Sequence, residues 1–375
     1  MRVLHMANSY FFVRRLLAGK LNGLSAEGVR VEAAATVPKG ASELPFLVHD
    51  LPVPRSINPV GDAAAFIRAL EIIRKGSYDI VHTHSAKAGF IGRLAAYFLD
   101  VPCVHSVHGL PFYEGQNPFA HGFFKALERF AGKRCSLILA QNHEDCETLR
   151  KLLPHQQVLY EGNGLDVAMV SAYAAQRDEA RKRMGLKETD VAVAMFARFE
   201  PVKRQDVFLD AFEQAAAKNG NLVAVFAGAD MGRGGTYASG ILRRIEQSPF
   251  KERILNLGFL EEPLSTLCGC DIVALTSEKE GIPRIVMEGM ALSLPVCATD
   301  APGTRELVRH RASGLLSPVG DSEVFCVNLL ELAGDAALRK ALGEAGNRFA
   351  RAELDESLVI KRILTAYASM LADRS

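Results

Sequence analysis

Short apolar runs alternate with longer amphipathic stretches along almost the whole chain. Apolar runs of roughly four to eight residues are typical of buried strands, and apolar residues at helical spacing are typical of helices that cover them. The pattern therefore predicts βα units and parallel sheets. In the first half it predicts strands at Arg2–Met6, Val29–Thr36, Ile80–His82, Cys103–Val107, Leu137–Ala140 and Gln157–Tyr160, and helices at Val13–Leu24, Ala63–Lys75 and Lys87–Leu99.

The second half repeats this rhythm. It predicts strands at Val191–Phe199, Leu222–Ala227, Ile254–Leu257, Ile272–Leu275, Pro295–Ala298 and Gly314–Leu316, with helices at Gln205–Lys218, Gly240–Gln247 and Ile285–Ser293. A loop at Glu161–Asp166 and a charged stretch at Gln176–Met184 separate the halves. We therefore predict an α/β protein with two Rossmann-like, doubly wound parallel-sheet domains, 1–165 and 166–355, facing a cleft where ligands of such sheets bind. A last helix, Glu356–Ala372 within the segment 356–375, is expected to cross back over the first domain.

Composition narrows the function classes. The 375 residues include 44 Lys and Arg against 43 Asp and Glu, so no basic excess favours nucleic acid as a partner. The seven cysteines form no Cys-x-x-Cys pair, which disfavours a disulfide scaffold and a structural zinc site. The chain shows neither a secretory signal nor the ~18 uncharged apolar residues of a membrane span. We expect a cytoplasmic protein with reduced thiols.

The most informative motif is SEKEGIPRIVMEGMA, residues 277–291, directly after a predicted strand. Glu280 lies in the loop and Glu288 in the following helix. If this helix begins near Pro283, its N-terminal amides and dipole can stabilise a phosphate, with Glu288 suited to sugar or ribose hydroxyls. The alternative is that both carboxylates are simply solvated, with Glu280 offsetting the helix dipole.

This Glu-x7-Glu motif, within EGIPRIVMEGMALSLPVCATDAPGTREL, resembles the retaining glycosyltransferases of group 1 (family 4), which have the two-domain GT-B fold. Further segments resemble the same family, and in the first domain its bacterial polysaccharide-assembly members. They are ARFEPVK (197–203), NGLD (163–166), VHTHSAKAG (81–89) and VHSVHG (104–109). Each pattern is weak alone, but their order and spacing together are specific.

Three positions are candidates for the chemistry. Arg198 and Lys203 follow the first strand of the second domain, where two cations can hold a diphosphate and stabilise its departure; surface charge is the alternative. His108 follows an apolar strand, and in the family the matching histidine contacts the donor sugar. His105 is a competitor, but it falls in mid-strand, which favours His108. The resemblance adds Glu280, which would orient the donor sugar.

The resemblance implies a donor site in the second domain. Glu288 would bind the ribose, and Gly258, Phe259 and Leu260 would hold the base through backbone groups. Pro283 replaces a family glycine and has no N–H, so the diphosphate contacts fall to Gly281, Ile282, Arg284 and Ile285. The turn Pro302–Glu306 is similar to a family turn near the donor. A plain loop is the alternative for both glycine-containing turns.

The acceptor side is expected in the first domain, with Ser9, His84 and Lys87 as candidate contacts. Ser85 is a candidate N-cap of the following helix, and a merely capped helix is an equal alternative. No metal is expected, since the chain has no Asp-x-Asp triplet and no carboxylate or thiol accompanies His82 and His84 at ligand spacing. No cofactor is expected beside the nucleotide sugar, which is a co-substrate.

The combined prediction is a metal-independent hexosyltransferase. It moves a hexose or N-acetylhexosamine from a UDP-linked donor to a glycan or lipid-linked hydroxyl, with retention by same-face attack as in the family. The aromatic and basic segment Pro111–Arg134 suits peripheral contact with the inner face of a membrane, with a core helix as the alternative. A nucleotide-sugar epimerase and a non-catalytic sugar-binding protein remain alternatives. An oxidoreductase is disfavoured because no GxGxxG follows a strand.

Overall fold

A computed structural model describes residues 1–54, 56, 58–113, 116–230 and 235–372. Residues 114–115 of the predicted aromatic and basic segment and the last residues of the segment 356–375 lie outside this part. The chain forms two compact units: residues 1–164 with the chain from Glu356 onward, and Leu165–Asp355. The predicted boundary followed residue 165. We describe each unit by itself.

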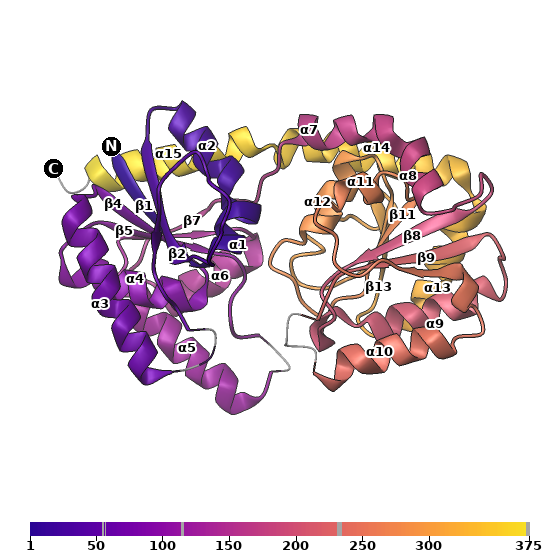
Figure 1. The fold of residues 1–375 in the computed structure, drawn as a ribbon, viewed down its shortest axis with the longest axis horizontal. Helices are drawn as coiled ribbons and strands as arrows, with labels where there is room; N and C mark the ends of the chain where they lie inside the picture. The colour runs from indigo at the N-terminus through magenta and orange to yellow at the C-terminus, as the bar shows by residue number, and fades with distance from the viewer. Residues whose placement is uncertain (55, 57, 114–115, 231–234, 373–375) are drawn as a thin grey trace. The chain divides into compact units, whose positions relative to one another are not determined.

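Each unit contains one parallel sheet (Figure 1). The first sheet has the order β3-β2-β1-β4-β5-β6-β7 and the second β10-β9-β8-β11-β12-β13. The strands are β1 Arg2–Ser9, β2 Arg30–Thr36, β3 Val48–Asp50, β4 Ile80–His84, β5 Cys103–Val107, β6 Leu137–Ala140, β7 Val158–Tyr160, β8 Val191–Phe196, β9 Leu222–Ala227, β10 Ile254–Asn256, β11 Ile272–Leu275, β12 Val296–Thr299 and β13 Gly314–Ser317. The strand order reverses at β1/β4 and at β8/β11, and these switch points are where doubly wound sheets bind ligands.

Helices connect the strands. In the first unit they are α1 Tyr10–Phe12, the π-helical turn Val13–Leu17, α2 Ala18–Ala26, α3 Pro59–Gly76, α4 Ala86–Phe98, α5 Pro118–Gly132, α6 His143–Leu152 and α15 Glu356–Ala372. In the second unit they are α7 Val167–Ala172, α8 Arg177–Arg183, α9 Gln205–Ala216, α10 Thr236–Gln247, α11 Leu264–Leu267, α12 Arg284–Ala291, α13 Ser322–Gly334 and α14 Ala336–Glu353, with 3-10 turns at Tyr173–Gln176, Pro201–Lys203 and Lys251–Arg253.

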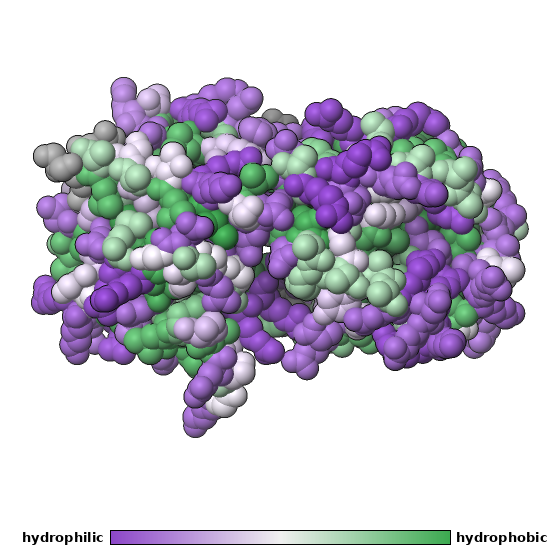
Figure 2. Space-filling view, turned by 90° about the horizontal axis from the view of Figure 1, so that it is seen from above, coloured by the Kyte–Doolittle hydropathy of each residue, from purple (hydrophilic) through white to green (hydrophobic). Residues whose placement is uncertain are grey.

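Each sheet buries both faces. In the first unit, Val3 and Ile80 belong to an apolar cluster with α2 and α15, whereas Leu4 and Val81 belong to a second cluster with α3 and α4. Successive residues of a strand point to opposite faces, so two helical layers are needed to cover such a sheet. Figure 2 shows polar side chains over much of one face of the molecule, with apolar residues distributed among them. None of the described helices is long and apolar enough to cross a membrane.

Helix α15 has the bounds that the sequence predicts, and it packs against α2 in the first unit. Its buried residues include Val359, Ile363 and Tyr367, which join the apolar cluster on the β1 and β4 face. The end of the chain therefore supplies part of the first unit's core.

Three predicted elements differ in ways that affect the sites. β4 ends at His84 rather than His82, so His84 is a strand residue, and β8 ends at Phe196 rather than Phe199, so Arg198 lies in a loop. Helix α12 begins at Arg284 with Pro283 as its N-cap. β3 was not predicted, because its three residues, VHD, carry no apolar pattern.

Candidate functional site

In the second unit, the segments that follow β8 and β11 lie against each other at the switch point of the sheet. The hydroxyl of Thr276 donates to the carbonyls of Lys203 (3.0 Å) and Arg204 (2.8 Å). The backbone N–H of Glu278 donates to the carbonyl of Val202 at 2.9 Å. These bonds hold Lys203, one of the two cations predicted to bind the diphosphate, beside the Glu-x7-Glu loop.

Lys203 and Glu280, two predicted site residues, form an ion pair. Lys203 Nζ lies 2.6 Å from Glu280 Oε1 and 2.8 Å from Oε2. Their side chains are only 15% and 11% exposed, and the Ser277 hydroxyl donates to Glu280 Oε1 at 2.5 Å. Partial desolvation strengthens such a pair relative to one in water, and three contacts fix the carboxylate. The structure therefore brings together two residues that are 77 positions apart.

Arg198 lies in the loop after β8 and is more exposed. Its guanidinium contacts Glu200 Oε1 at 2.7 Å, and its side chain is 49% exposed. Gly228, after β9, packs against this loop with φ +146°, and a Cβ there would lie 1.9 Å from the Ala197 carbonyl oxygen. Only glycine allows the two backbones to approach so closely. The loop that carries Arg198 therefore follows β8 and packs against the turn after β9.

The loop before α12 is closely packed. A Cβ on Gly303, which has φ +78°, would lie 2.1 Å from the carbonyl oxygen of Gly281, and the N–H of Glu280 donates to the Pro302 carbonyl at 3.1 Å. Within α12, Arg284 Nε lies 2.8 Å from Glu288 Oε1. The amides of Arg284 and Ile285 are in the first helical turn, where N–H groups lack intrahelical partners.

The predicted base-binding turn joins the same edge of the sheet. The N–H of Gly228 donates to the carbonyl of Gly258 at 2.7 Å, which links the turns after β9 and β10. Phe259 is 55% exposed, and Gly258 has φ +62°. The residues predicted at 258–260 thus lie at the carboxyl end of β10, beside the turn after β9.

Arg204 is a residue of this region that the sequence analysis missed. Its backbone is left-handed at φ 50°, and its guanidinium pairs with Asp206 and Glu278, each at 2.9 Å. Hydrogen bonding with Asp206, opposed by burial, raises the pKa of Arg204. These two ion pairs fix the position of Arg204, and with it the backbone next to Lys203. Its position beside Lys203 was the one available signal.

In the first unit, a pocket of about 230 Å³ opens at the carboxyl ends of β4 and β5. It is lined by Phe12, Ser85, Ala86, His105, Ser106, Val107, His108, Gly109, Pro111 and Glu128. Ser85 has φ 62° and ψ 162°, a conformation that costs a non-glycine residue of order 1–3 kcal/mol and is typical of functional sites. The candidate histidine therefore borders a pocket with a strained rim.

His108 sits between two ring partners. Its Nε2 lies 3.0 Å from His84 Nδ1, and the ring of Phe12 meets it edge-on at 5.0 Å. His105 also borders the pocket, but it lies in β5 with its Nδ1 2.8 Å from the Thr83 hydroxyl. The two histidines thus have separate environments, one at the strand end and one within the strand.

The three predicted acceptor residues have structural partners. Ser9 caps α1 by accepting from the N–H of Phe12 at 3.3 Å. Lys87 donates to the Pro54 carbonyl at 2.9 Å and pairs with Asp62 at 2.6 Å. His84 is fully buried, behind His108, which differs from the exposed position that direct contact with an acceptor requires.

Ser85 occupies the N-cap position of α4, but its side chain makes no capping hydrogen bond. Its hydroxyl donates to the carbonyl of His84, and Asn8 Oδ1 instead accepts from the N–H of Ala88 at 2.8 Å. The predicted capping role of Ser85 is therefore wrong, because its positive φ turns the side chain to a different partner. Asn8 ties the end of β1 to the start of α4 across the switch point.

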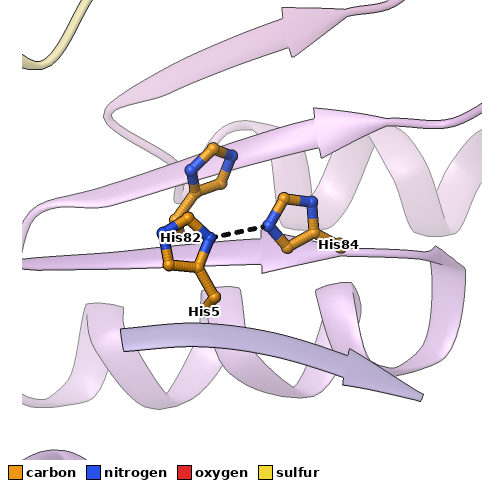
Figure 3. A group of neighbouring side chains, drawn as sticks. All are labelled: His5, His82 and His84. Carbon is orange, nitrogen blue, oxygen red and sulfur yellow. Dashed lines mark hydrogen bonds between the residues drawn. The ribbon is translucent and has the colours of Figure 1, made fainter. Parts of the chain in front are cut away.

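His5, His82 and His84 form a buried group on β1 and β4 (Figure 3), with one nitrogen of each within 4.8 Å of the others. Their rings are stacked or tilted: His82 lies 4.4 Å from His84 and 4.8 Å from His5 between centroids, with interplanar angles of 25° and 37°. A tetrahedral metal needs ring nitrogens whose in-plane lone pairs converge. Stacked rings do not provide this, and both nitrogens of His82 are hydrogen-bonded elsewhere. The group fits hydrogen-bonded imidazoles better than metal ligands.

A second buried chain of polar groups passes through His82. Lys20 forms an ion pair with Glu161, whose Oε2 accepts from the Ser106 hydroxyl at 2.5 Å. Ser106 also contacts His82 Nε2 at 2.7 Å, and His82 Nδ1 lies 2.5 Å from the hydroxyl of Tyr367. Helix α15 is thus hydrogen-bonded to the central strands of the sheet.

Burial keeps these histidines neutral. Desolvation, with the nearby charge of Lys20, lowers the pKa of His5 to about 3 and that of His108 to about 4. Desolvation first, then neighbouring histidines, lowers the pKa of His82 and of His84 well below the ordinary value. For His108, hydrogen bonding with Gln141 and the charge of Glu161 partly oppose this effect.

Comparison with known families identifies the family to which the chain belongs. The family described as "Glycosyl transferases group 1" matches residues 176–349, and that described as "Glycosyltransferase Family 4" matches residues 13–168. The chain belongs to the group 1, family 4 glycosyltransferases. The transferase is similar to the Escherichia coli UDP-Gal:alpha-D-GlcNAc-diphosphoundecaprenol alpha-1,3-galactosyltransferase, with 29% identity over 76% of this chain and 74% of that protein. It is also 23% identical to the N-acetyl-alpha-D-glucosaminyl L-malate synthase of Bacillus anthracis, over 84% of this chain and 81% of that protein.

Solved structures show that the glycosyltransferase has the predicted GT-B fold. Anabaena HepE in complex with UDP and glucose superposes with a TM-score of 0.83 at 19% identity, covering 98% of this chain and all of that one. The sucrose-phosphate synthase of Thermosynechococcus elongatus also gives 0.83, at 17% identity and full coverage of both chains. At this identity the likeness concerns the fold.

Proposed function

We propose that the enzyme transfers a hexose or N-acetylhexosamine from a UDP-linked donor to a hydroxyl of a glycan or lipid-linked acceptor, with retention at the anomeric carbon. The second unit would bind the donor and the first unit the acceptor. Arg198 and Lys203 would stabilise the departing diphosphate, Glu280 would orient the donor sugar, and Glu288 would bind the ribose.

The observation that carries this proposal is the Lys203–Glu280 pair at the switch point of the second sheet. An ammonium has three N–H donors, so Lys203 can keep its contact with Glu280 and still donate to a phosphate oxygen. The first turn of α12 begins four residues after Glu280 and offers the N–H groups and the positive end of the helix dipole. One region thus offers groups for both the sugar and the diphosphate.

The relatives support the substrate classes. The name of the Escherichia coli enzyme gives UDP-Gal as donor and an undecaprenol diphosphate carrier on the acceptor. Anabaena HepE was solved with UDP and glucose. A UDP-sugar and a lipid-linked glycan are therefore the first substrates to test.

The pocket of the first unit supports retention without a protein nucleophile. Among the described residues that line it, the carboxylate is that of Glu128, whose two oxygens lie 2.5 Å and 3.0 Å from the guanidinium nitrogens of Arg93. Burial raises the pKa of Glu128, but Arg93 outweighs this and lowers it. A carboxylate bound on both oxygens is a poor nucleophile, so we infer same-face attack assisted by the leaving phosphate.

Helix α5 supports a membrane-bound acceptor. Phe119, Phe123 and Phe130 are exposed, and Phe119 is 83% exposed, whereas Phe112 lies in the core. Arg134 lies 3.7 Å over the ring of Phe130, and Lys125 and Arg129 are exposed on the same helix. Exposed aromatic and basic side chains together favour anionic lipid surfaces. We propose that α5 contacts the membrane from which the acceptor is taken.

A panel of UDP-, GDP- and ADP-sugars tests the donor claim by protection against thermal unfolding, followed by transfer assays with lipid-linked glycans. We expect UDP-sugars to raise the unfolding temperature and the product to keep the α-configuration by NMR. Absence of stabilisation by every nucleotide sugar would contradict the proposal. Donor turnover without an acceptor would indicate an epimerase.

Cosedimentation with vesicles tests the membrane claim. The protein should bind vesicles containing phosphatidylglycerol more than those of phosphatidylcholine alone, and Phe119→Ser with Phe123→Ser should weaken this binding. Lys340→Ala, a change at an exposed lysine of the second unit, is the control. Equal binding of the parent and the double variant would rule out α5 as the contact.

A further inference from the structure

We propose that His5 and His84 are positioning residues that hold His108 as the tautomer with its proton on Nδ1, so that His108 offers a hydrogen-bond donor at the pocket. The inference deepens the proposed function and rests on it, because the family resemblance implies that His108 contacts the donor sugar during transfer. It assigns His84 a role behind the pocket instead of one in direct contact with the acceptor.

The three rings form a continuous hydrogen-bonded row. His5 Nδ1 lies 3.0 Å from His84 Nε2, and His84 Nδ1 lies 3.0 Å from His108 Nε2. The rings of His5 and His84 are nearly parallel, at 13°, and the dashed line in Figure 3 marks their bond. Strand pairing sets this up, because His5 of β1 is in register with His82 of β4, and His84 points to the same face two residues later.

The direction in which the rings of the row donate their protons follows from one buried nitrogen. His5 Nε2 is buried and has no hydrogen-bond partner among the described residues. A neutral imidazole carries a single N–H, so the protons in the row all point one way or all the other. If they point toward His5, a buried N–H is left without an acceptor, whereas if they point toward His108, only a lone pair is left unused. Orphaned buried N–H groups are the rarer of the two, which favours donation from His5 to His84 and from His84 to His108.

The remaining nitrogen of His108 then carries the proton. Its Nε2 accepts from His84, so Nδ1–H is the donor that remains. His108 borders the pocket, so a sugar oxygen bound there can accept from this N–H. A residue fixed in one tautomer recognises an oxygen acceptor without prior rearrangement.

The surroundings of the row are aromatic, and they keep it neutral. His82 stacks on His84 and lies tilted by 37° against His5, and Phe12 meets His108 edge-on. Burial first, with a further contribution from the ammonium of Lys20, lowers the pKa of His5, His84 and His108, so an added proton is disfavoured throughout. Glu161, the nearby carboxylate, is paired with Lys20 and Ser106.

Nitrogen NMR of the full-length protein labelled with 15N-histidine tests the row without any substrate. Protonated and bare ring nitrogens have distinct 15N shifts, and single His→Asn variants assign the signals. We expect Nδ1–H tautomers at His5, His84 and His108. An Nε2–H tautomer at His108 in the parent protein would overturn the proposal.

Three variants separate positioning from packing. His84→Leu removes the donor and should leave His108 with mixed tautomers, whereas His84→Asn keeps an N–H near the position of Nδ1 and should restore the single tautomer. His82→Asn is the matched control, since His82 is equally buried on the same strand but outside the row. It should lower the unfolding temperature and leave the His108 signals unchanged. Loss of the tautomer in His82→Asn, or its persistence in His84→Leu, would contradict the proposal.

Kinetics then connect the row to transfer. We expect His84→Leu to lower kcat about tenfold with little change in the KM for the UDP-sugar, and His84→Asn to recover most of it. Equal kcat values for His84→Leu and the parent enzyme would overturn the claim that His84 assists transfer by positioning His108. If no nucleotide sugar is transferred while the tautomers follow the prediction, the proposed function fails and the row stands.

Cobalt distinguishes the row from a metal site. We expect no d–d absorption after Co²⁺ is added to the protein, because stacked histidine rings do not direct their lone pairs to one metal ion. A Co²⁺ spectrum that disappears in His5→Asn would establish a metal centre and overturn the hydrogen-bonded row.

Discussion

The two sheets reverse their strand order in the same way, yet they place opposite chemistry at the reversal. At β1/β4 the first unit has buried, neutral imidazoles joined by hydrogen bonds. At β8/β11 the second unit has partly exposed charges, with Lys203 on Glu280 and Arg198 on Glu200. The comparison teaches that this topology fixes where a site lies, while the loops and strand ends decide whether it favours neutral hydroxyls or a charged diphosphate.

The difference follows from desolvation. Charged groups lose much free energy on burial, whereas a neutral imidazole with hydrogen-bond partners loses little. In the first unit the histidine row stays neutral, and buried charges such as those of Lys20 and Glu161 or of Arg93 and Glu128 lie in ion pairs. The second unit keeps its cations near water, where a diphosphate can reach them.

The largest expected effect comes from breaking the buried ion pair of the first unit. Lys20→Met leaves Glu161 as an unpaired buried charge and should lower the free energy of unfolding by about 3–5 kcal/mol. Adding Glu161→Gln removes this charge and keeps an acceptor for Ser106, so the double variant should recover most of the loss. Denaturant unfolding measures both, and a single variant as stable as the parent would show that the pair is not desolvated.

The matching change in the second unit acts on chemistry instead of stability. Lys203→Ala should lower the transfer rate by about 10²–10³-fold and weaken nucleotide binding, because a donor to the developing negative charge is lost. Lys340→Ala, at an exposed lysine of α14, should leave the rate unchanged. If Lys203→Ala transferred sugar as fast as the parent enzyme, the proposal that Lys203 binds the diphosphate would be wrong.

The pH dependence of stability tests whether the histidines of the first unit are neutral. Their pKa values are lowered in the folded protein, to about 3 for His5 and about 4 for His108, so the unfolded chain binds more protons below its ordinary pKa of about 6.5. Stability should therefore be fully present above about pH 6.5 and fall as the pH decreases toward the folded values. Each histidine can contribute a slope of up to ~1.4 kcal/mol per pH unit.

The measurement is the thermal midpoint between about pH 7.5 and pH 5 for the parent and for His5→Asn. We expect a smaller loss on acidification in the variant, because one titrating group is absent. Parallel curves would mean that His5 does not contribute to the pH dependence.

The smallest expected effect is at the surface of the second unit. Arg284→Ala removes the i,i+4 partner of Glu288 from a pair whose arginine is 38% exposed, and should lower stability by only about 0.3–0.5 kcal/mol. Nucleotide affinity is the informative readout, since Glu288 is the proposed ribose contact. A loss above tenfold in affinity would give the guanidinium itself a place in the donor site.

The sequence predicted the charged site better than the neutral one. Arg198, Lys203 and Glu280 lie in short loops after apolar strands, and such loops gather at the carboxyl edge of a parallel sheet, so strand periodicity was enough to group them. Their pairing was not predictable, because it depends on how the loops after β8 and β11 pack together. Arg204 was missed for the same reason.

The histidine row depends on strand register, which apolar patterning does not fix. His5 and His82 are adjacent because β1 pairs with β4 across the residues between them, and β4 reaches His84 only because β5 continues alongside it. The predicted strand ended at His82, so the sequence did not place His84 on the same face of the sheet, and it gave no reason to place His5 beside them. The unpaired Nε2 of His5, from which the direction of the row was inferred, is visible only with side chains in place.

Helix α15 has a consequence for the order in which the molecule is made. The second unit is one continuous segment, Leu165–Asp355, and can complete its fold as soon as it has left the ribosome. The first unit waits for Tyr367, which lies on the same sheet face as Val3 and bonds to His82, so until α15 is made the part of this face that it covers lacks its apolar partners. The half of the protein that is synthesised first is therefore the half that is finished last.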